Sequence, residues 1–234
     1  MIYINEEKIR TNDLDNFDHL SIKAILNFFQ DGAGQHAEKL GIGFQALKDK
    51  NLYWVLVKTR ITKYLEPKPF SKVYIKTWPE EKGRIDFIRN YEIKDADDNL
   101  LAVGSSQWCL IDADSRKIVR TDGISYPGVC FDGKIYNEKL TSIKPILNNK
   151  VFSFRVGNSS LDHNWHMNNS KYADIVYDAL TQSEIEGIKD FQINYLHEAK
   201  EGDIIDVYKE IVDNEIIISG SIVNTPCFSS KVGL

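Results

Sequence analysis

The sequence predicts an α+β chain of two similar units in tandem, each with a long helix wrapped by an antiparallel sheet. In each half, one strand-like run is followed by a helical run and then by four strand-like runs. Residues 123–148 break this order, because they are rich in glycine and proline and lack sustained periodicity. We therefore expect units at residues 1–122 and 149–234, joined by a linker at 123–148 that covers part of the surface.

The first unit begins with a strand at residues 2–10, where apolar residues alternate. A helix follows over residues 22–40, since apolar residues recur there at spacings of three and four. Ser21 can cap this helix and Gly41 can end it. Gly32 and Gly34 each cost the helix about 1 kcal/mol relative to alanine. They predict that a wrapped sheet packs closely there.

Four strand-like runs complete the first unit, with alternation that is clearest from Val55 to Ile61 and from Val73 to Thr77. These runs cover residues 52–64, 71–78, 84–94 and 100–112. One strand, one long helix and four antiparallel strands is the order of a hotdog fold. The second unit repeats it, with strands at 151–156, 191–197, 204–212, 215–222 and 227–232 and a helix at 169–185.

The two units also share short sequence similarities. Phe17-Asp18-His19 precedes the first helix as Leu161-Asp162-His163 precedes the second. Two such units predict a pseudo-dimer, because a lone hotdog sheet leaves an edge and a helix face to cover. With this alignment the first unit has Leu20 and Ile22 in place of Asn164 and His166, and neither side chain can move a proton. We therefore expect the first unit to hold the substrate and the second to be catalytic.

Composition excludes several classes of protein. The 234 residues are 42% hydrophobic and 27% charged, which is ordinary for a globular chain. A cytoplasmic protein without a membrane partner is expected, since no transmembrane run and no basic-then-apolar leader is visible. The net charge of -5 argues against nucleic acid. Cys109, Cys130 and Cys227 are far apart and are expected to be reduced thiols.

The segment from Ser160 to Tyr172 is where chemistry is expected. Asp162, Asn164 and His166 form a D-x-N-x-H pattern, and Asn168-Asn169 then leads into an apolar helix. Such a polar cluster can bring a base and free backbone N–H groups to a substrate carbonyl. The alternatives are a loop cap for Asp162, helix caps for the two asparagines and a buried, hydrogen-bonded His166. No metal site is expected, because helical histidine spacing and a cysteine partner are lacking.

A known family matches this pattern. The run D-x-N-x-H-x-N-N-x-x-Y resembles the acyl-[acyl-carrier-protein] (acyl-ACP) thioesterases, which hydrolyse acyl-ACP and end fatty-acid synthesis. Further matching segments are Asn51 to Val55, Ile75 to Trp78, Ser106 to Trp108 and Tyr195 to Glu198. The resemblance spans nearly the whole chain. It implies a double-hotdog enzyme that releases a free fatty acid and holo-ACP and needs no cofactor.

Thioester hydrolysis needs a nucleophilic water and a stabilised oxyanion, because a thiol of pKa about 8.5 leaves readily. Glu198 can act as the general base with His166 as its relay. Asn164 can orient the water or hold the carbonyl, and Asp162 can fix the tautomer or the orientation of a neighbouring side chain. Family resemblance also assigns these four residues to catalysis. Backbone N–H groups near Asn168 and Asn169 are expected to stabilise the oxyanion.

Plant family members have a cysteine after the glutamate, whereas this chain has Ala199, so a water-based route is favoured. Phe29 and Trp54 are expected to line the acyl slot, although either can equally belong to the core. A local basic surface should meet the acidic carrier protein, and the candidates for it are Lys134, Lys139, Lys144 and Lys150; the alternative is that these lysines only solvate the linker region. The alternative functions are a non-catalytic acyl-ACP or acyl-CoA-binding protein and an acyl-CoA thioesterase. The pseudo-dimer can still pair with itself as a homodimer.

Overall fold

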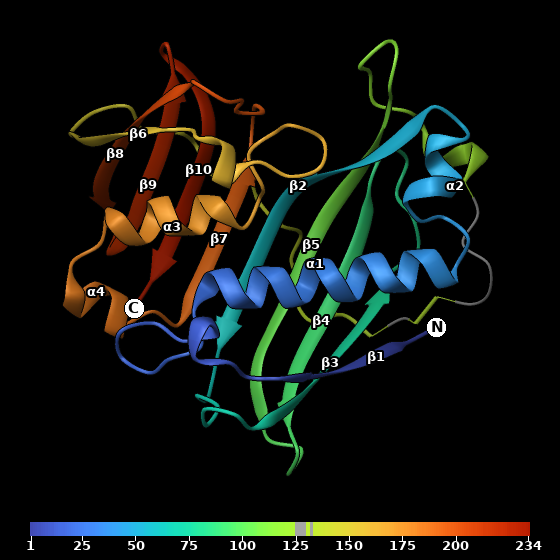
Figure 1. The fold of residues 1–234 in the computed structure, drawn as a ribbon, viewed down its shortest axis with the longest axis horizontal. Coiled ribbons are helices and arrows are strands. Elements are labelled where there is room, and N and C mark those ends of the chain that lie inside the picture. The colour runs from blue at the N-terminus through green and yellow to red at the C-terminus, as the bar shows by residue number, and fades with distance from the viewer. Residues whose placement is uncertain (125–129, 132) are drawn as a thin grey trace.

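The computed structural model describes residues 1–124, 130–131 and 133–234 and contains one continuous ten-stranded sheet with the helices on one face (Figure 1). The first unit comprises β1 (Tyr3–Lys8), α1 (Ile22–Lys39), α2 (Phe44–Lys48), β2 (Leu52–Lys63), β3 (Lys72–Pro79), β4 (Phe87–Asp95) and β5 (Leu100–Asp112). The second comprises β6 (Lys150–Arg155), α3 (Lys171–Asp178), α4 (Gln182–Glu186), β7 (Asp190–Tyr195), β8 (Ile204–Val212), β9 (Glu215–Ile222) and β10 (Thr225–Gly233).

The strand order shows the internal symmetry of the sheet. It runs β1-β3-β4-β5-β2-β7-β10-β9-β8-β6, so each strand of the first unit has a counterpart at the mirrored place in the second. All neighbouring strands pair antiparallel, and β2 joins β7 at the centre, from Lys58 opposite Asn194 to Thr62 opposite Asp190. This join gives the inner edge of each unit a partner, as the predicted pseudo-dimer requires.

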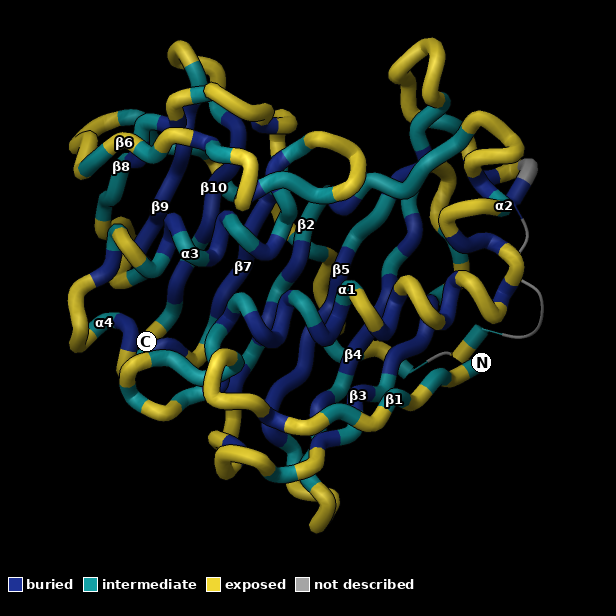
Figure 2. The backbone as a smooth tube through the Cα atoms, viewed as in Figure 1, coloured by how far each residue is buried: buried dark blue, intermediate teal, exposed yellow. Residues whose placement is uncertain are grey.

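Helix α1 crosses the sheet of the first unit and buries its apolar side against it (Figure 2). Ser21 begins the helix by accepting a hydrogen bond from the Ala24 N–H at 3.2 Å, as predicted. Phe29 stacks on Tyr91 of β4 with ring centroids 4.1 Å apart. It also covers Gly104 of β5, where a Cβ would lie only 2.3 Å from the Phe29 ring. Gly104 is thus needed for the helix to lie this close to the sheet.

The two helix glycines have different surroundings. A Cβ on Gly32 would lie 3.6 Å from Ile75 and 3.7 Å from Thr77, which is ordinary contact with β3. A Cβ on Gly34 would meet no atom within 4 Å. The predicted close packing is therefore wrong for Gly34, because this position faces open space.

Two helix predictions also need correction. The continuous helix expected over residues 169–185 is wrong, because α3 ends at Asp178 and α4 starts anew. Thr181 caps α4 by accepting a hydrogen bond from the Glu184 N–H, and the Glu184 carboxylate accepts one from the Thr181 N–H, so a capping box sets the break. Helix α2 was not predicted, and it is only five residues long.

The connection between the units lies across the face of the sheet opposite the helices. The indole N–H of Trp78 donates to the Gly133 carbonyl at 2.6 Å, and the Gln192 amide donates to the Thr141 carbonyl at 2.7 Å. The Ile146 N–H donates to Ser219 Oγ at 3.1 Å. These contacts agree with a linker that covers surface. Residues 125–129 and 132 of the expected linker lie outside the described residues, and the predicted unit boundaries stay predictions.

No helix in the described ranges is long and apolar enough to cross a membrane.

Candidate active site

The D-x-N-x-H segment forms a tight loop shaped by Asp162. Its Oδ1 accepts the backbone N–H of Asn164 at 2.8 Å and that of His166 at 3.3 Å. The Asp162 N–H donates to the His166 carbonyl at 2.8 Å, which closes the loop. Trp165 adopts a left-handed φ of +65° within this turn. Asp162 is thus a loop cap, and its effect on His166 is to fix the position of the histidine backbone.

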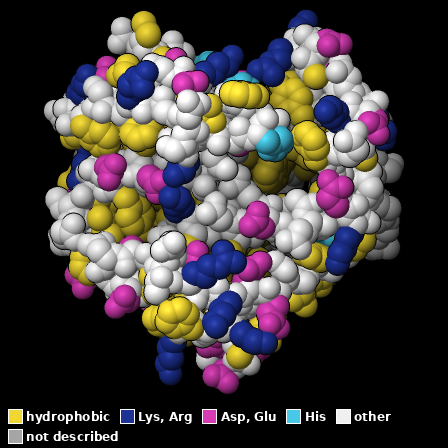
Figure 3. All heavy atoms as spheres, in the orientation of Figure 1, with side chains coloured by type: hydrophobic (Ala, Val, Ile, Leu, Met, Phe, Trp, Pro, Cys, Tyr) yellow, Lys and Arg dark blue, Asp and Glu magenta, His cyan; other side chains and the backbone are white. Residues whose placement is uncertain are grey.

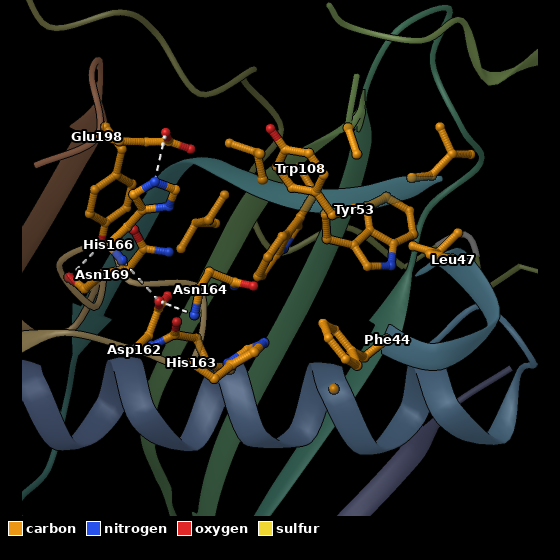
Figure 4. A pocket seen from close by; sticks show the side chains of 18 of the residues that line it. Phe44, Leu47, Tyr53, Trp108, Asp162, His163, Asn164, His166, Asn169 and Glu198 are labelled. Carbon is orange, nitrogen blue, oxygen red and sulfur yellow. Dashed lines mark hydrogen bonds and ion pairs between the residues drawn. The ribbon is translucent and has the colours of Figure 1, made fainter. Parts of the chain in front are cut away.

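A distant segment holds the other side of this loop. The Met167 N–H donates to the Ala199 carbonyl at 2.8 Å, and His166 forms an isolated bridge with Lys200. This backbone pairing places His166 Nε2 3.3 Å from Glu198 Oε2 (Figure 4). The His166 side chain is 21% exposed and that of Glu198 is 38% exposed, so both can contact water. The structure therefore brings the predicted imidazole and carboxylate together.

Arg116 also contacts Glu198, although no sequence motif marks it as a site residue. Its Nη2 donates to Glu198 Oε2 at 2.7 Å, and its Nη1 donates to the Tyr53 hydroxyl at 2.8 Å. Arg116 lies in the turn after β5, with a φ of +57°. No local pattern indicates this contact, because Arg116 comes from the first unit and is 82 residues from its partner.

These side chains line one end of a cavity of about 710 Å³. Its other walls come from α1, α2 and the first half of β2, including Gly34, Phe44 and Trp54. Figure 3 shows the opening as a hollow lined by hydrophobic side chains, with a histidine at its rim. Phe44 meets His163 edge-to-face across the cavity, with ring centroids 5.0 Å apart.

The predicted substrate-binding residues divide between cavity and core. Trp54 lines the cavity, and its indole N–H donates to the Ile42 carbonyl at 3.0 Å. Phe29 does not line it, since this side chain is 2% exposed and stacks on Tyr91 in the core. The core alternative is therefore the correct one for Phe29.

Of Asn168 and Asn169, only Asn169 lines the cavity. Asn168 Oδ1 accepts the Ser170 N–H at 2.9 Å, and the Asn168 N–H donates to the Ser160 carbonyl at 2.9 Å. The Asn168 N–H is therefore occupied within the loop, and it is not available to an oxyanion. Asn169 lines the cavity, and its N–H has no protein acceptor within the described part of the chain. Its carbonyl accepts the Tyr195 hydroxyl at 3.1 Å, which fixes the peptide.

The first unit contains a loop with the same hydrogen bonds. Asp15 Oδ1 accepts the N–H groups of Phe17 at 2.9 Å and His19 at 3.0 Å, and the Asp15 N–H donates to the His19 carbonyl at 2.8 Å. Asp15 thus corresponds to Asp162, and the predicted alignment of the repeat is wrong by three residues. The first unit has Phe17 where the second has Asn164.

The first unit also has a glutamate in the mirrored place. Glu66 precedes β3 as Glu198 precedes β8, but its contacts are internal. One carboxylate oxygen accepts the Leu20 N–H at 2.7 Å, and the other pairs with Lys63 Nζ at 2.8 Å. The Lys63 side chain is only 5% exposed. Glu66 therefore neutralises a buried cation, which leaves it no role as a base.

Among the described residues, neither a thiol nor a metal site is found at the cavity. No cysteine in the described ranges lines it, and burial raises the pKa of Cys227 to about 12. The described residues contain no group of three or more histidine, cysteine or acidic side chains arranged to hold a metal ion.

Comparison with known proteins gives consistent matches. A profile described as the acyl-ACP thioesterase N-terminal domain matches residues 2–123, and one described as the C-terminal domain matches residues 143–225. Oleoyl-acyl carrier protein thioesterase 2 of Arabidopsis thaliana is 25% identical over 233 residues, which are 90% of this chain and 64% of that protein. The Coriandrum sativum oleoyl-acyl carrier protein thioesterase is 27% identical over 207 residues, covering 80% of this chain and 56% of that protein. The chain thus spans less than two thirds of the length of these relatives.

Solved structures share the fold over nearly the full chain. An acyl-ACP thioesterase from Bacteroides thetaiotaomicron has a TM-score of 0.91 at 25% identity and covers 99% of this chain and 96% of its own. The 12:0-ACP thioesterase of Umbellularia californica has a TM-score of 0.86 at 16% identity and the same coverage. These similarities confirm the predicted double-hotdog fold.

Proposed function

The chain belongs to the acyl-ACP thioesterase family, and we propose that it hydrolyses fatty acyl-ACP to a free fatty acid and holo-ACP. The observation that carries this proposal is the contact between His166 and Glu198, 3.3 Å apart at one end of a cavity of about 710 Å³. An apolar cavity can take the acyl chain, and the imidazole and carboxylate can act on a water beside the thioester.

In the proposed mechanism, a water lies between the thioester carbonyl and the His166–Glu198 pair. Glu198 accepts the proton of the attacking water as the new C–O bond forms, and His166 passes that proton to the sulfur as the C–S bond breaks. The departing thiolate needs little assistance, since its pKa is about 8.5. The Asn169 N–H and the Asn164 side-chain amide are the donors we assign to the oxyanion, because the first has no acceptor among the described residues and both residues line the cavity.

Two further residues act by positioning. Asp162 fixes the loop that presents Asn164 and His166. Arg116 holds the Glu198 carboxylate at 2.7 Å, which keeps one oxygen directed to His166. The short hydrogen bond also limits rotation of a side chain that is partly exposed, so the base stays oriented before substrate binds.

Water is the proposed nucleophile. Ala199 follows Glu198, and no described cysteine contacts the cavity, so a covalent thioester on a cysteine has no support at this site. The alternatives are an acyl-CoA thioesterase and a non-catalytic acyl-binding protein. The cytoplasmic location and the homodimer expected from the sequence stay predictions.

One experiment separates the three functions. The same acyl group is supplied on ACP and on CoA, thiol release is measured, and His166→Ala serves as the control. We expect a higher kcat/KM with acyl-ACP and loss of that activity in the variant. Faster cleavage of acyl-CoA would assign the chain to acyl-CoA hydrolysis, and binding without cleavage of either thioester would identify a non-catalytic protein.

A further inference from the structure

A smaller cavity of about 120 Å³ adjoins the main one in the first unit. Five residues line both cavities: Gln30, Gly34, Ala37, Trp54 and Trp108. Most of the remaining wall is apolar, with Ile42 and Phe87, but one lining side chain is an arginine, Arg89 of β4. An acyl chain that starts at His166 and follows the main cavity past Trp54 therefore reaches a cation.

No described acidic side chain pairs with Arg89 to compensate its charge. The residue is 6% exposed, and its Nη1 contacts His36 Nδ1 at 2.9 Å and Thr77 Oγ1 at 3.3 Å. Within the described part of the chain, Nε and Nη2 have no acceptor and no carboxylate pairs with the guanidinium. Burial and the charge of Arg89 lower the pKa of His36 to about 4, so this histidine is neutral near pH 7. A guanidinium stays protonated, so this end of the cavity carries a positive charge.

Among the described residues, the buried Lys63 and the half-buried Arg60 each have a carboxylate partner. Lys63, with a side chain 5% exposed, pairs with Glu66 at 2.8 Å. Arg60, on the opposite face of the sheet, makes three contacts with Asp190 at 3.0 to 3.2 Å. Since an uncompensated buried charge is strongly unfavourable, the lack of a carboxylate partner for Arg89 among the described residues points to a partner supplied from the cavity.

We propose that Arg89 binds an oxygen acceptor, above all a carboxylate, carried near the distal end of the acyl chain. The preferred substrates would then be acyl thioesters whose far end is oxygenated. A methyl-ended chain of the same length would remove water from the guanidinium without replacing its hydrogen bonds. This inference rests on the proposed function, because it places the thioester at His166 and Glu198.

The test compares acyl-ACPs of matched and graded chain length that end in a methyl, a hydroxyl or a carboxylate group. For the wild-type protein, we expect at least one length at which an oxygenated chain has a kcat/KM about tenfold or more above that of the methyl-ended chain. Arg89→Leu should reverse this preference and Arg89→Lys should retain part of it. Arg60→Leu is the matched control and should keep the wild-type preference.

A binding measurement tests the role of Arg89 separately from thioester hydrolysis. N-acetylcysteamine thioesters with methyl or carboxylate ends are titrated calorimetrically into the His166→Ala variant. This measurement reports binding and does not depend on turnover. Tighter binding of the carboxylate-ended probe supports the proposal even if no thioester is cleaved. Equal or weaker binding of that probe, together with a wild-type preference for methyl ends at every length, would overturn it while leaving hydrolysis intact. The wild-type measurements decide the matter even if Arg89→Leu does not fold.

Discussion

Glu198 and Glu66 occupy mirrored places in the two units, so they provide a matched pair of substitutions. Glu198→Gln removes the proposed base while keeping nearly the same shape. General base catalysis typically contributes 10²- to 10⁴-fold, so kcat should fall by about that factor, which is about 2.7 to 5.4 kcal/mol. The lost Glu198–Arg116 pair is exposed, with side chains 38% and 51% accessible, so the free energy of unfolding should fall by only about 0.2 to 1 kcal/mol.

Glu66→Gln should have the opposite effect. It leaves the buried Lys63 without its counter-charge, and Glu66 itself is about one third exposed, so we expect a loss of about 1 to 3 kcal/mol in stability. For a chain of 234 residues, this lowers Tm by about 2 to 4 °C per kcal/mol. The kcat should stay close to that of the wild type, since Glu66 does not line the cavity.

The two variants are compared by acyl-ACP hydrolysis and by thermal unfolding under the same conditions. We expect Glu198→Gln to lose activity and keep its stability, and Glu66→Gln to lose stability and keep its activity. Near-normal turnover of Glu198→Gln would refute its role as the base. A similar loss of kcat in a folded Glu66→Gln protein would refute the assignment of chemistry to the second unit alone.

The remaining predictions concern the cavity, a buried histidine and Arg116. Position 34 faces open cavity space, so Gly34→Ala should raise the free energy of unfolding by about 0.5 to 1 kcal/mol in chemical denaturation. Gly34→Phe should fill that space and lower kcat/KM for long acyl chains more than for short ones. Gly32→Ala is the control and should keep the wild-type chain-length preference. The pKa of His36 is about 4 in the folded protein and 6.5 in the unfolded chain, so the unfolded chain binds more protons between pH 4 and 6.5. The free energy of unfolding should therefore fall by about 3 kcal/mol as the pH drops through this range. His36→Gln should reduce this loss in urea denaturation at a series of pH values; an unchanged pH dependence would contradict the assignment. Arg116→Gln should lower kcat while changing Tm little, since it only positions Glu198, and a Tm loss with unchanged kcat would show a structural role instead.

The sequence predicts the strands and α1 well because their signals are local. Alternation marks a strand with one buried face, and α1 has apolar spacing, a serine cap and a glycine end. The break between α3 and α4 was missed because apolar spacing continues through Ala179 and Leu180. The Thr181-x-x-Glu184 capping box was visible in the sequence and marks the true start of α4.

The site is predictable only where its residues are close in sequence. The D-x-N-x-H spacing defines the loop, and the match to a known family adds Glu198, but nothing local connects Arg116 with that glutamate. Periodicity identified Phe29 as a buried residue and could not tell a sheet contact from a cavity wall. The predicted alignment of the two units is wrong because both contain an Asp-His pair, which places Asp18 opposite Asp162. The residue with the same hydrogen bonds as Asp162 is Asp15, three residues earlier.

Direct attack by water at the His166–Glu198 pair is tested most directly by a single turnover in H₂¹⁸O with enzyme in excess over acyl-ACP. The released fatty acid and the intact mass of the protein are measured at short times. Direct attack predicts that the acid carries ¹⁸O on this first turnover and that the protein never gains the mass of the acyl group. An unlabelled acid with ¹⁸O in the Glu198 peptide, or an acylated protein at any time point, would contradict it.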